Sequence, residues 1–467
     1  MSSSTAALNA AAAGTSLRDK AWARWLALGL LAFAMFCSYI FMDILSPIKD
    51  LLQSTRGWDS TAFGTMQGSE TFLNVFIFFL IFAGIILDKM GVRFTAVLSG
   101  GVMLVGATIN WYALTDAFLG SSLDVWFTNH LNYIPGFDEL GISPFYEGMP
   151  ASAKLSAVGF MIFGCGVEMA GITVSRGIVK WFKGREMAMA MGSEMALARL
   201  GVGTCMIFSP LVANFGGDIS VSRSVAFGVV LLMVALIMFI VYFFMDKKLD
   251  AQTGEAEEKD DPFRISDLGK ILSSLGFWVV ALLCVLYYSA IFPFQKYAVN
   301  MLQCNLSLHP ESVSEFWQSD LCTYIQYVIM LVVAGGAFGF SFSKSKSVKI
   351  PSLVISIVAL VVYCVMGYMR QSAAAIFAVF PLLAVGITPI LGNYVDYKGK
   401  AASMLVFGAL LLIICHLTFA FILPVFKGND LGGVMVAYIT ILVLGASFSL
   451  VPASLWPSVP KLVDAKI

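Results

Sequence analysis

The stretch Gly84-Ile85-Ile86-Leu87-Asp88-Lys89-Met90-Gly91-Val92-Arg93 has a counterpart 308 positions later, Gly392-Asn393-Tyr394-Val395-Asp396-Tyr397-Lys398-Gly399-Lys400. Both copies share the pattern Gly-x3-Asp-x2-Gly, followed closely by a basic residue, and each copy separates two long apolar segments. One copy alone is weak evidence in a chain with 41 glycines. Two copies at equivalent positions indicate two related helical bundles arranged as parallel repeats.

The composition predicts a membrane protein. Hydrophobic residues make up 59% of the chain, charged residues only 12%, and the mean hydropathy is +0.85. Soluble domains contain about 25% charged residues. The length of the apolar segments favours membrane-spanning helices over barrel strands. Twelve such segments are found at 24–47, 71–88, 95–113, 154–175, 187–210, 223–245, 272–298, 323–342, 350–369, 373–393, 401–424 and 434–454.

The distribution of Lys and Arg predicts the orientation. With the N-terminus in the cytoplasm, 21 of the 29 basic residues lie on the cytoplasmic side and six on the other side. The positive-inside rule therefore favours an even number of crossings, with both termini in the cytoplasm. The first twenty residues lead into a helix too long for a signal-peptide core, which predicts an uncleaved first span. They contain no acidic dileucine-type sorting signal, so we expect a bacterial inner (plasma) membrane.

Charge and loop composition divide the chain into parts. We predict an N-terminal six-helix bundle over 1–246, a cytoplasmic linker over 247–270, and a C-terminal bundle over 271–467. The linker is rich in acidic residues. A long stretch over 114–153 carries five acidic residues and no Lys or Arg. We interpret it as a solvated cap on the outer side, with a role in shaping the outer mouth or binding a partner as the alternative.

Both signatures resemble those of the major facilitator superfamily, which lie between helices 2 and 3 and between helices 8 and 9. A narrower resemblance points to the branch that contains a lysosomal dipeptide transporter and its bacterial relatives. This resemblance implies two bundles around a central cavity, alternating access, and facilitated transport without obligatory proton coupling. It rests on Phe36–Tyr39 leading to Asp43, Trp181–Glu186 followed by Ala198–Gly201, Tyr287-Tyr288 before Phe292–Phe294, and Ser454–Pro457.

The C-terminal half departs from the family pattern. Counted from the second signature, 373–393 and 401–424 correspond to helices 8 and 9, yet they are the tenth and eleventh apolar segments. The preceding pair, within about 323–369, therefore predicts a hairpin inserted after helix 7. The chain then ends after the helix that corresponds to the family's tenth. We expect the usual last two helices to be missing, the chain to be a fragment, and the inserted pair to pack at the periphery.

The signature residues predict a conformational role without substrate contact. Their glycines allow tight turns, and Asp88 is placed to pair with Arg93. The residues in this group are Gly84, Asp88, Gly91, Arg93, Gly392, Asp396 and Gly399.

Two ionisable residues within the predicted spans are candidates for substrate binding. Arg199 lies about halfway along helix 5 and Glu168 about two thirds along helix 4. A charge at this depth is costly unless it is paired or hydrated, so each is a functional candidate. Arg199 is suited to bind a peptide carboxylate and Glu168 a peptide ammonium group, and the family's binding residues fall on these two positions. The alternative is a buried bridge between them without a ligand role.

Other candidates lie nearer the helix ends. Asp43 and Lys296 are placed to form an outer gate, or to act as interfacial side chains. Glu194 lies about 140° round the ideal helix from Arg199, so we expect it to face elsewhere as a packing or rim charge. The aromatic candidates for contact with the substrate side chain, with packing as the alternative, are Tyr287, Tyr288, Phe292 and Trp456.

The sequence favours a carrier of dipeptides or similar small zwitterions. An organic-anion exchanger would use Arg199 but have little need of Glu168, and a membrane receptor is supported by the long loop alone. The motifs of enzymes, nucleotide loops and metal sites are lacking, so we expect no catalytic activity, cofactor or metal. The net charge is zero, which argues against nucleic-acid binding. The expected partners are a small-molecule substrate and the lipid bilayer, and the sequence is silent on an accessory subunit.

Overall fold

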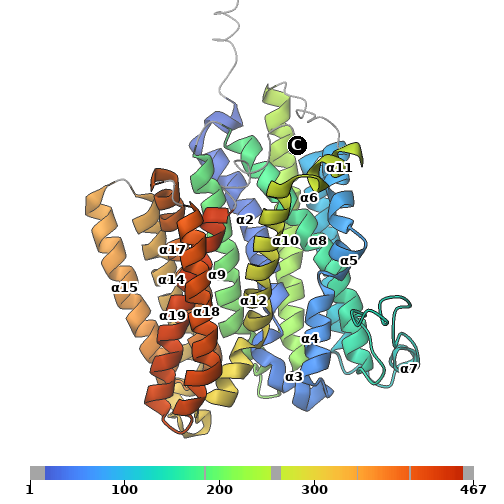
Figure 1. Cartoon of the computed structure of the whole chain (residues 1–467), viewed down its shortest axis with the longest axis vertical. Helices are drawn as coiled ribbons and strands as arrows, with labels where there is room; N and C mark the ends of the chain where they lie inside the picture. The colour runs from blue at the N-terminus through green and yellow to red at the C-terminus, as the bar shows by residue number, and fades with distance from the viewer. Residues whose placement is uncertain (1–15, 184–185, 254–264, 344, 399–400, 456–467) are drawn as a thin grey trace, which may run out of the picture.

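The computed structural model describes residues 16–183, 186–253, 265–343, 345–398 and 401–455, and the regular secondary structure of this part of the chain consists of helices, without strands (Figure 1). The N-terminal half contains η1 (Leu17–Asp19), α2 (Ala21–Asp43), η2 (Ser46–Ile48), α3 (Lys49–Arg56), α4 (Ser60–Ser69), α5 (Phe72–Phe76), α6 (Phe79–Ala113), α7 (Ser122–Asn129), α8 (Ala151–Trp181), α9 (Met187–Ala213) and α10 (Val221–Thr253). The C-terminal half contains α11 (Ile265–Leu272), α12 (Leu275–Asn305), η3 (Pro310–Ser312), α13 (Glu315–Gln318), α14 (Asp320–Phe342), α15 (Lys346–Met369), α16 (Ala373–Phe377), α17 (Val379–Lys398), α18 (Ala401–Leu417), η4 (Thr418–Ile422), η5 (Leu423–Phe426) and α19 (Asp430–Leu455).

All twelve predicted apolar segments fall on helices. In the described ranges, ten helical stretches are long and apolar enough to cross a membrane. Helix α6 contains the end of the second segment and the whole of the third, with a kink between them. At Gly91 the backbone leaves the helical conformation, with φ of 80° and ψ of 168°. A residue with a Cβ rarely adopts such a positive φ, so Gly91 makes the turn that the first signature predicts. The second span begins earlier than predicted, since α4 starts at Ser60.

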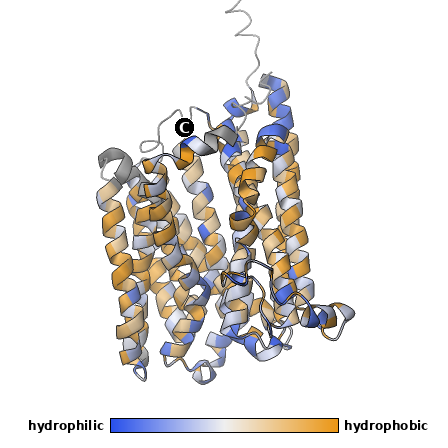
Figure 2. Ribbon diagram, turned by 45° about the vertical axis from the view of Figure 1, so that its right-hand side comes forward, coloured by the Kyte–Doolittle hydropathy of each residue, from blue (hydrophilic) through white to orange (hydrophobic). Residues whose placement is uncertain are grey.

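The exterior of the helices is apolar along most of their length, and polar residues concentrate at both ends (Figure 2). In α15, all of which is described, the buried residues are Tyr363, Met366 and Gly367, and large apolar side chains cover much of the remaining surface. An apolar band of this kind matches the hydrocarbon core of a bilayer. The structure therefore confirms an all-helical membrane protein.

The two ends of the molecule differ in what they carry (Figure 1). The start of α2, the end of α10 and the start of α11 lie at one end, which we call the linker end. Helices α3 and α7 lie at the opposite end, which we call the loop end. Helix α10 continues to Thr253, into the segment predicted as a linker, and α11 provides a further helical turn before α12. The boundaries of the predicted parts remain predictions.

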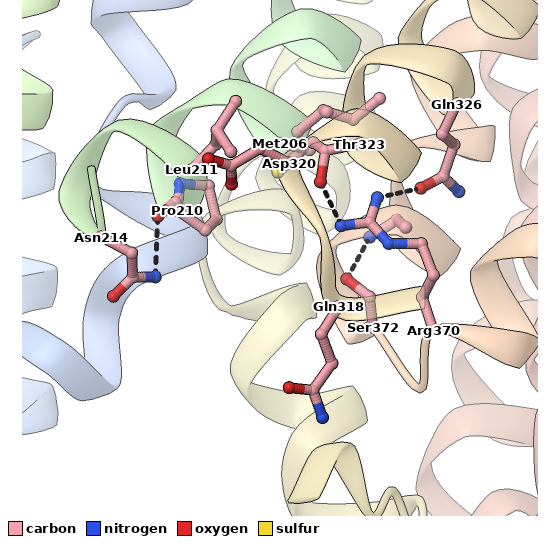
Figure 3. A pocket seen from close by; sticks show the side chains of 12 residues that line it. Met206, Pro210, Leu211, Asn214, Gln318, Asp320, Thr323, Gln326, Arg370 and Ser372 are labelled. Atoms are coloured by element: carbon pink, nitrogen blue, oxygen red, sulfur yellow. Dashed lines mark hydrogen bonds between the residues drawn. The ribbon is translucent and has the colours of Figure 1, made fainter. Parts of the chain in front are cut away.

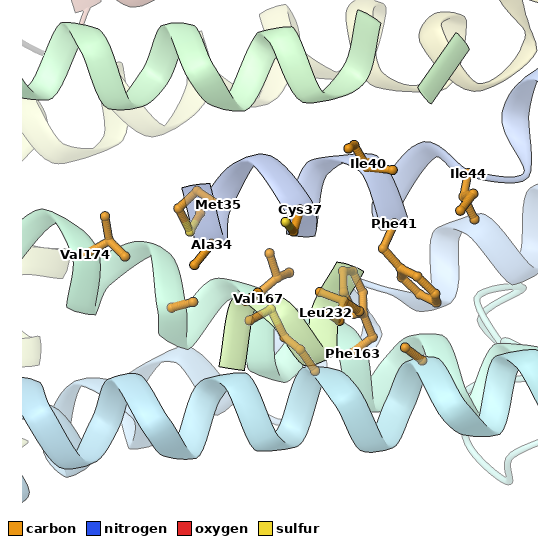
Figure 4. Close-up of a cluster of buried hydrophobic side chains, with 14 of the residues drawn as sticks. Ala34, Met35, Cys37, Ile40, Phe41, Ile44, Phe163, Val167, Val174 and Leu232 are labelled. Atoms are coloured by element: carbon orange, nitrogen blue, oxygen red, sulfur yellow. The ribbon is translucent and has the colours of Figure 1, made fainter. Parts of the chain in front are cut away.

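Each half of the chain has its own hydrophobic core. In the N-terminal bundle, Ala34, Cys37 and Phe41 of α2 face Phe163 and Val167 of α8 (Figure 4). Helix α9 contributes to both cores, because side chains from both of its halves pack in the first core and others, from Ala196 onward, pack in the second. The seam between the two bundles therefore runs along α9.

The predicted hairpin consists of α14 and α15, which pack along each other. Helix α15 lies at the periphery, as predicted. For α14 the prediction is wrong, because Met330, Val333 and Ala334 belong to the core of the C-terminal bundle and α14 also contacts α9. Its side chains at these positions are small or flexible apolar groups, which pack between α9 and α17. The insertion itself and the missing helices remain predictions.

Candidate substrate site between the two bundles

Arg199 lies on the seam and is held by aromatic rings from both bundles. Its guanidinium carbon is 4.5 Å from the ring centroid of Phe448 on α19 and 5.7 Å from that of Tyr39 on α2. It forms no ion pair or hydrogen bond with any other described residue. Cation–π contacts stabilise the charge by about 0.5–2 kcal/mol and leave its N–H donors unused. The guanidinium is therefore available to an anionic group.

Glu168 lies on α8 and is half-buried. Within the described part of the chain it makes no ion pair or hydrogen bond, so the bridge to Arg199 considered above does not form in this structure. Gly164, one turn earlier on the same face of α8, allows close approach by the backbone of Glu70. A Cβ at Gly164 would lie 1.9 Å from the carbonyl oxygen of Glu70. The two acidic residues therefore lie close together on the wall of the seam.

Glu70 is a site residue that our sequence reasoning missed. It follows α4 directly, where the second span is interrupted before α5, and its side chain is 7% exposed. It too makes no ion pair or hydrogen bond with the described residues. A signal was present, because Glu70 is an acidic residue immediately before the apolar segment predicted from residue 71. Ionisable residues buried at membrane depth are typical of substrate and ion pathways.

The acidic residues and Arg199 gather around Tyr39. The Tyr39 side chain lies within electrostatic range of Arg199, Glu194, Glu168 and Glu70. Glu194 is also close enough to Arg199 for their charges to interact, although the two side chains form no ion pair. That Glu194 faces elsewhere remains a prediction. The seam thus brings together one cation and three acidic groups.

Aromatic residues of α12 continue from this cluster. Tyr287 is buried, its ring stacks on Phe448 with centroids 6.3 Å apart, and its hydroxyl donates to the carbonyl of Ser447 at 3.3 Å. Tyr288 stacks on Phe292 with centroids 5.0 Å apart. Phe448 therefore contacts both Tyr287 of α12 and Arg199. Trp456 lies outside the described residues.

Asp43 and Lys296 form an ion pair at the loop end, as their placement suggested. The Lys296 ammonium is 2.8 Å from Asp43 Oδ1 and donates to the carbonyl of Met42 at 2.8 Å. Gln295, which we did not anticipate, donates from Nε2 to Asp43 Oδ2 at 2.7 Å. Asp43 and Gln295 are buried. The pair connects α2 of the first bundle to α12 of the second in a largely desolvated position.

Further polar contacts close the same end. Tyr297 donates to the Ser60 carbonyl at 2.6 Å, and Asn300 donates to Asp50 at 2.7 Å. Thr204 and Tyr327 hydroxyls are 3.5 Å apart across the seam. All hydrogen bonds between the bundles that join two described residues lie in the loop-end half. The structure is therefore a state with its loop end closed.

The first signature forms ion pairs, but not the pair that we predicted. Asp88 pairs with Arg176 of α8, and Arg93 pairs with Asp250 of α10 at 2.8 Å. The prediction of an Asp88–Arg93 pair is wrong, because the turn at Gly91 directs the two side chains to different helices. Both pairs tie α6 to its neighbours at the linker end.

A buried carboxylate extends this network at the linker end. Lys180 contacts Asp246 at 2.6 Å and Asp250 at 2.8 Å, and the Trp181 indole donates to Asp246 at 2.8 Å. Trp181, the first residue of the Trp-Phe-Lys-Gly-Arg-Glu motif, therefore acts with the preceding Lys180 to hold α8 against α10. These contacts make the linker end of the N-terminal bundle a connected unit.

Several other predicted residues have fewer described contacts. Gly84 has open space where a Cβ would lie, so its conformational role remains a prediction. Gly392 and Asp396 lie on α17, in the part of that helix whose side chains are not described, and Gly399 lies outside the described residues. Among the described residues, no group of three His, Cys, Asp or Glu side chains is arranged to hold a metal ion.

Comparisons with known proteins agree with this architecture. The lysosomal dipeptide transporters MFSD1 of Homo sapiens and Bos taurus are each 21% identical over 449 residues, which cover 94% of this chain and 73% of the relative. The xylose transporter XylE from E. coli, solved in a partially occluded inward open conformation, has a TM-score of 0.50 and 11% identity, covering 92% of this chain and 85% of that chain. The family model for the Major Facilitator Superfamily matches residues 31–371. This chain therefore belongs to the major facilitator superfamily.

Proposed function

We propose that the protein moves small zwitterionic solutes, most simply dipeptides, across a membrane by alternating access. The observation that carries this proposal is the environment of Arg199. Its guanidinium lies between a ring of each bundle and has no anionic partner among the described residues. Arg199 is half-buried, and a charge partly removed from water without a counter-ion is destabilised, so such a site favours an anionic ligand. Relatives named as dipeptide transporters support the choice of solute.

The opposite charges of a dipeptide fit the charges of the seam. Arg199 binds the terminal carboxylate through two parallel N–H donors, which gives both energy and orientation. Glu168 accepts the terminal ammonium group, and the neighbouring Glu70 increases the negative potential there. The rings of Tyr287, Tyr288 and Phe292 form the apolar wall for the substrate side chains. An organic anion would leave the two acidic residues without a cation.

Transport then requires the two bundles to rock about the site. In the closed loop end, the Asp43–Lys296 pair connects the bundles, so opening that end requires breaking it. The signature contacts at the linker end keep the N-terminal bundle rigid during this motion. Phe160 occupies the place on α8 where many superfamily members carry an Arg, so a proton-coupling scheme that uses this Arg does not apply. We propose facilitated uniport.

The orientation and location follow from the same reasoning. The linker end lies in the cytoplasm, because it carries most of the Lys and Arg residues. The end of the seam that Asp43 and Lys296 close is then the outer end. We assign the protein to the inner (plasma) membrane of a bacterium, with cytoplasmic termini.

Uptake into proteoliposomes tests the proposal. The purified protein is reconstituted, and uptake of labelled dipeptides is compared with uptake of free amino acids and dicarboxylates, with and without a pH gradient. Saturable dipeptide uptake that is independent of the gradient is the expected result. Selective dicarboxylate exchange would replace the proposal by an anion exchanger, and the absence of uptake for all three classes would favour a receptor.

A further inference from the structure

A pocket lies at the loop end of the seam (Figure 3). It has a volume of about 180 Å³ and is lined by side chains from both bundles. Met206, Pro210 and Asn214 come from α9 and the residue after it, whereas Thr323 and Arg370 lie across the seam. On α9, the pocket residue closest in sequence to Arg199 is Met206. It lies about two helical turns beyond Arg199, so the pocket is separate from the proposed substrate site. A space of this size accommodates several water molecules or one small solute.

Arg370 gives the pocket a cation without a bound anion. It follows α15 directly, and its Nε donates to the Trp317 carbonyl at 3.1 Å, its Nη1 to Gln326 Oε1 at 2.6 Å, and its Nη2 to the Thr323 hydroxyl. All three acceptors are neutral. Since a guanidinium has five N–H groups, two are left without an acceptor among the described residues. Burial lowers the pKa of Arg370, as expected for a charge held away from water.

Gln326 carries a further donor that is not used within the protein. Its side chain is fully buried, and its carbonyl oxygen is used by Arg370, which leaves the Nε2 group without a hydrogen-bond partner. Buried donors in folded proteins nearly always have an acceptor. The acid on the pocket lining, Asp320, is exposed and forms no ion pair with a described residue, although it lies within electrostatic range of Arg370. The inner part of the pocket is therefore rich in donors and positively charged.

We propose that this pocket binds a small carboxylate and that the bound carboxylate holds the loop end closed. A carboxylate has two oxygens that accept hydrogen bonds from the unused N–H groups of a guanidinium such as that of Arg370. Because one wall belongs to α9 and the other to the C-terminal bundle, the pocket is complete while these elements are together. A ligand that binds one of two conformations better shifts the population toward it. The effect on transport rests on the proposed function, whereas the binding does not.

Binding is measured on the purified full chain in detergent. Sodium acetate, the neutral isostere acetamide and sodium chloride are titrated at constant ionic strength, with saturation-transfer NMR and thermal unfolding as readouts. We expect acetate to bind and to raise the unfolding temperature, and acetamide and chloride to have no such effect. Arg370→Gln should weaken acetate binding by about tenfold or more, because it removes the cation from a desolvated site. Asp320→Asn should strengthen acetate binding, because it removes a repulsive charge.

Arg223 offers a matched control. It is a loop-end arginine that does not line the pocket and donates to the carbonyls of Ala213, Phe215 and Asp218. Arg223→Gln should leave acetate binding unchanged. Acetate binding that survives Arg370→Gln, or equal binding of chloride, would overturn the proposal. If Arg370→Gln fails to fold, unchanged acetate affinity in Asp320→Asn overturns it instead.

Transport provides the second readout. Acetate added on the loop side of proteoliposomes should lower the maximal rate of dipeptide uptake without changing its KM, and this inhibition should disappear in Arg370→Gln. Competitive inhibition would place acetate at Arg199 and overturn the proposal. Acetate binding together with an absence of dipeptide transport would reject the proposed function and leave the pocket assignment standing.

Discussion

Asp43 on α2 and Lys296 on α12 form an ion pair with an N–O distance of 2.8 Å, and this pair joins the two bundles at the loop end. The Asp43 side chain is 1% exposed and that of Lys296 is 13% exposed, so neither charge is well solvated. Gln295 completes the hydrogen bonding of the carboxylate. The strength of this closure is therefore sensitive to the loss of either partner.

Asp43→Asn should weaken closure of the loop end by about 3 kcal/mol, because it leaves the Lys296 ammonium buried without its counter-ion. Cys205, which is fully buried on α9 and lies within electrostatic range of the pair, is a native reporter. We expect faster labelling of Cys205 by a maleimide, measured by peptide mass spectrometry. The double variant with Lys296→Gln should label more slowly than the single variant. Labelling unchanged from the wild type would argue against a gate.

Arg199→Lys should lower dipeptide uptake by roughly 10- to 100-fold while leaving expression and thermal stability near normal, because Lys keeps the charge but loses the planar fork. The guanidinium has no ion-pair partner in the described part of the chain, so the fold depends little on it. Uptake and unfolding are measured on the same preparation. Near-normal uptake would reject Arg199 as the carboxylate site.

Glu168→Gln should abolish the preference for a free amino terminus, because it removes the charge that faces the substrate ammonium. The measurement is competition of labelled dipeptide uptake by free and N-acetylated dipeptides. In the wild type, the free form should compete about tenfold better or more, as expected for a charge-assisted hydrogen bond. Equal competition by the two forms in the wild type would show that Glu168 lacks this role.

Asp88→Asn should slow transport with little change in substrate affinity, because the residue pairs with Arg176 at the linker end, away from Arg199. We expect the same of Asp396→Asn in the second signature. The maximal uptake rate and equilibrium dipeptide binding are measured separately. A large loss of affinity at an unchanged maximal rate would contradict a conformational role.

Gly106→Ala should destabilise the N-terminal bundle by about 2 kcal/mol, which is typical of overpacking in a core. Helices α6 and α8 approach so closely that a Cβ at Gly106 would lie 2.5 Å from the carbonyl oxygen of Gly159. Gly101 on the same helix has open space at this position, so Gly101→Ala is the control and should have little effect. Thermal unfolding of both variants in detergent gives the comparison. Equal unfolding temperatures would mean that the backbones separate without cost.

Part of the candidate site was predictable from the sequence. Arg199, Glu168, Asp43 and Lys296 stand out because each is a charge in an apolar segment, where charges are costly. The structure places Arg199 and Glu168 on the wall of the seam and pairs Asp43 with Lys296. Glu70 was missed because it precedes the segment that we placed from residue 71.

The partners of these charges were not predictable in the same way. Within the signature, the basic residues nearest to Asp88 are Lys89 and Arg93. Asp88 nevertheless contacts Arg176, which lies 88 positions further along the chain. Nothing in the segment around Phe448 predicts that its ring contacts Arg199 rather than lipid. Such contacts depend on how each helix is rotated about its axis and on where it crosses its neighbour.

The sequence by itself determined the membrane location, the positions of the apolar helices, the turn at Gly91 and the duplication of the signature. These features are local, because hydrophobicity, charge and backbone freedom act within one segment. Only the tertiary structure decided that the loop end is closed by Asp43 and Lys296, that α14 packs on the seam, and that Arg370 lines a separate pocket. These depend on packing between segments far apart in the chain, where side-chain shape and the geometry of helix crossing select one arrangement among many with the same hydropathy.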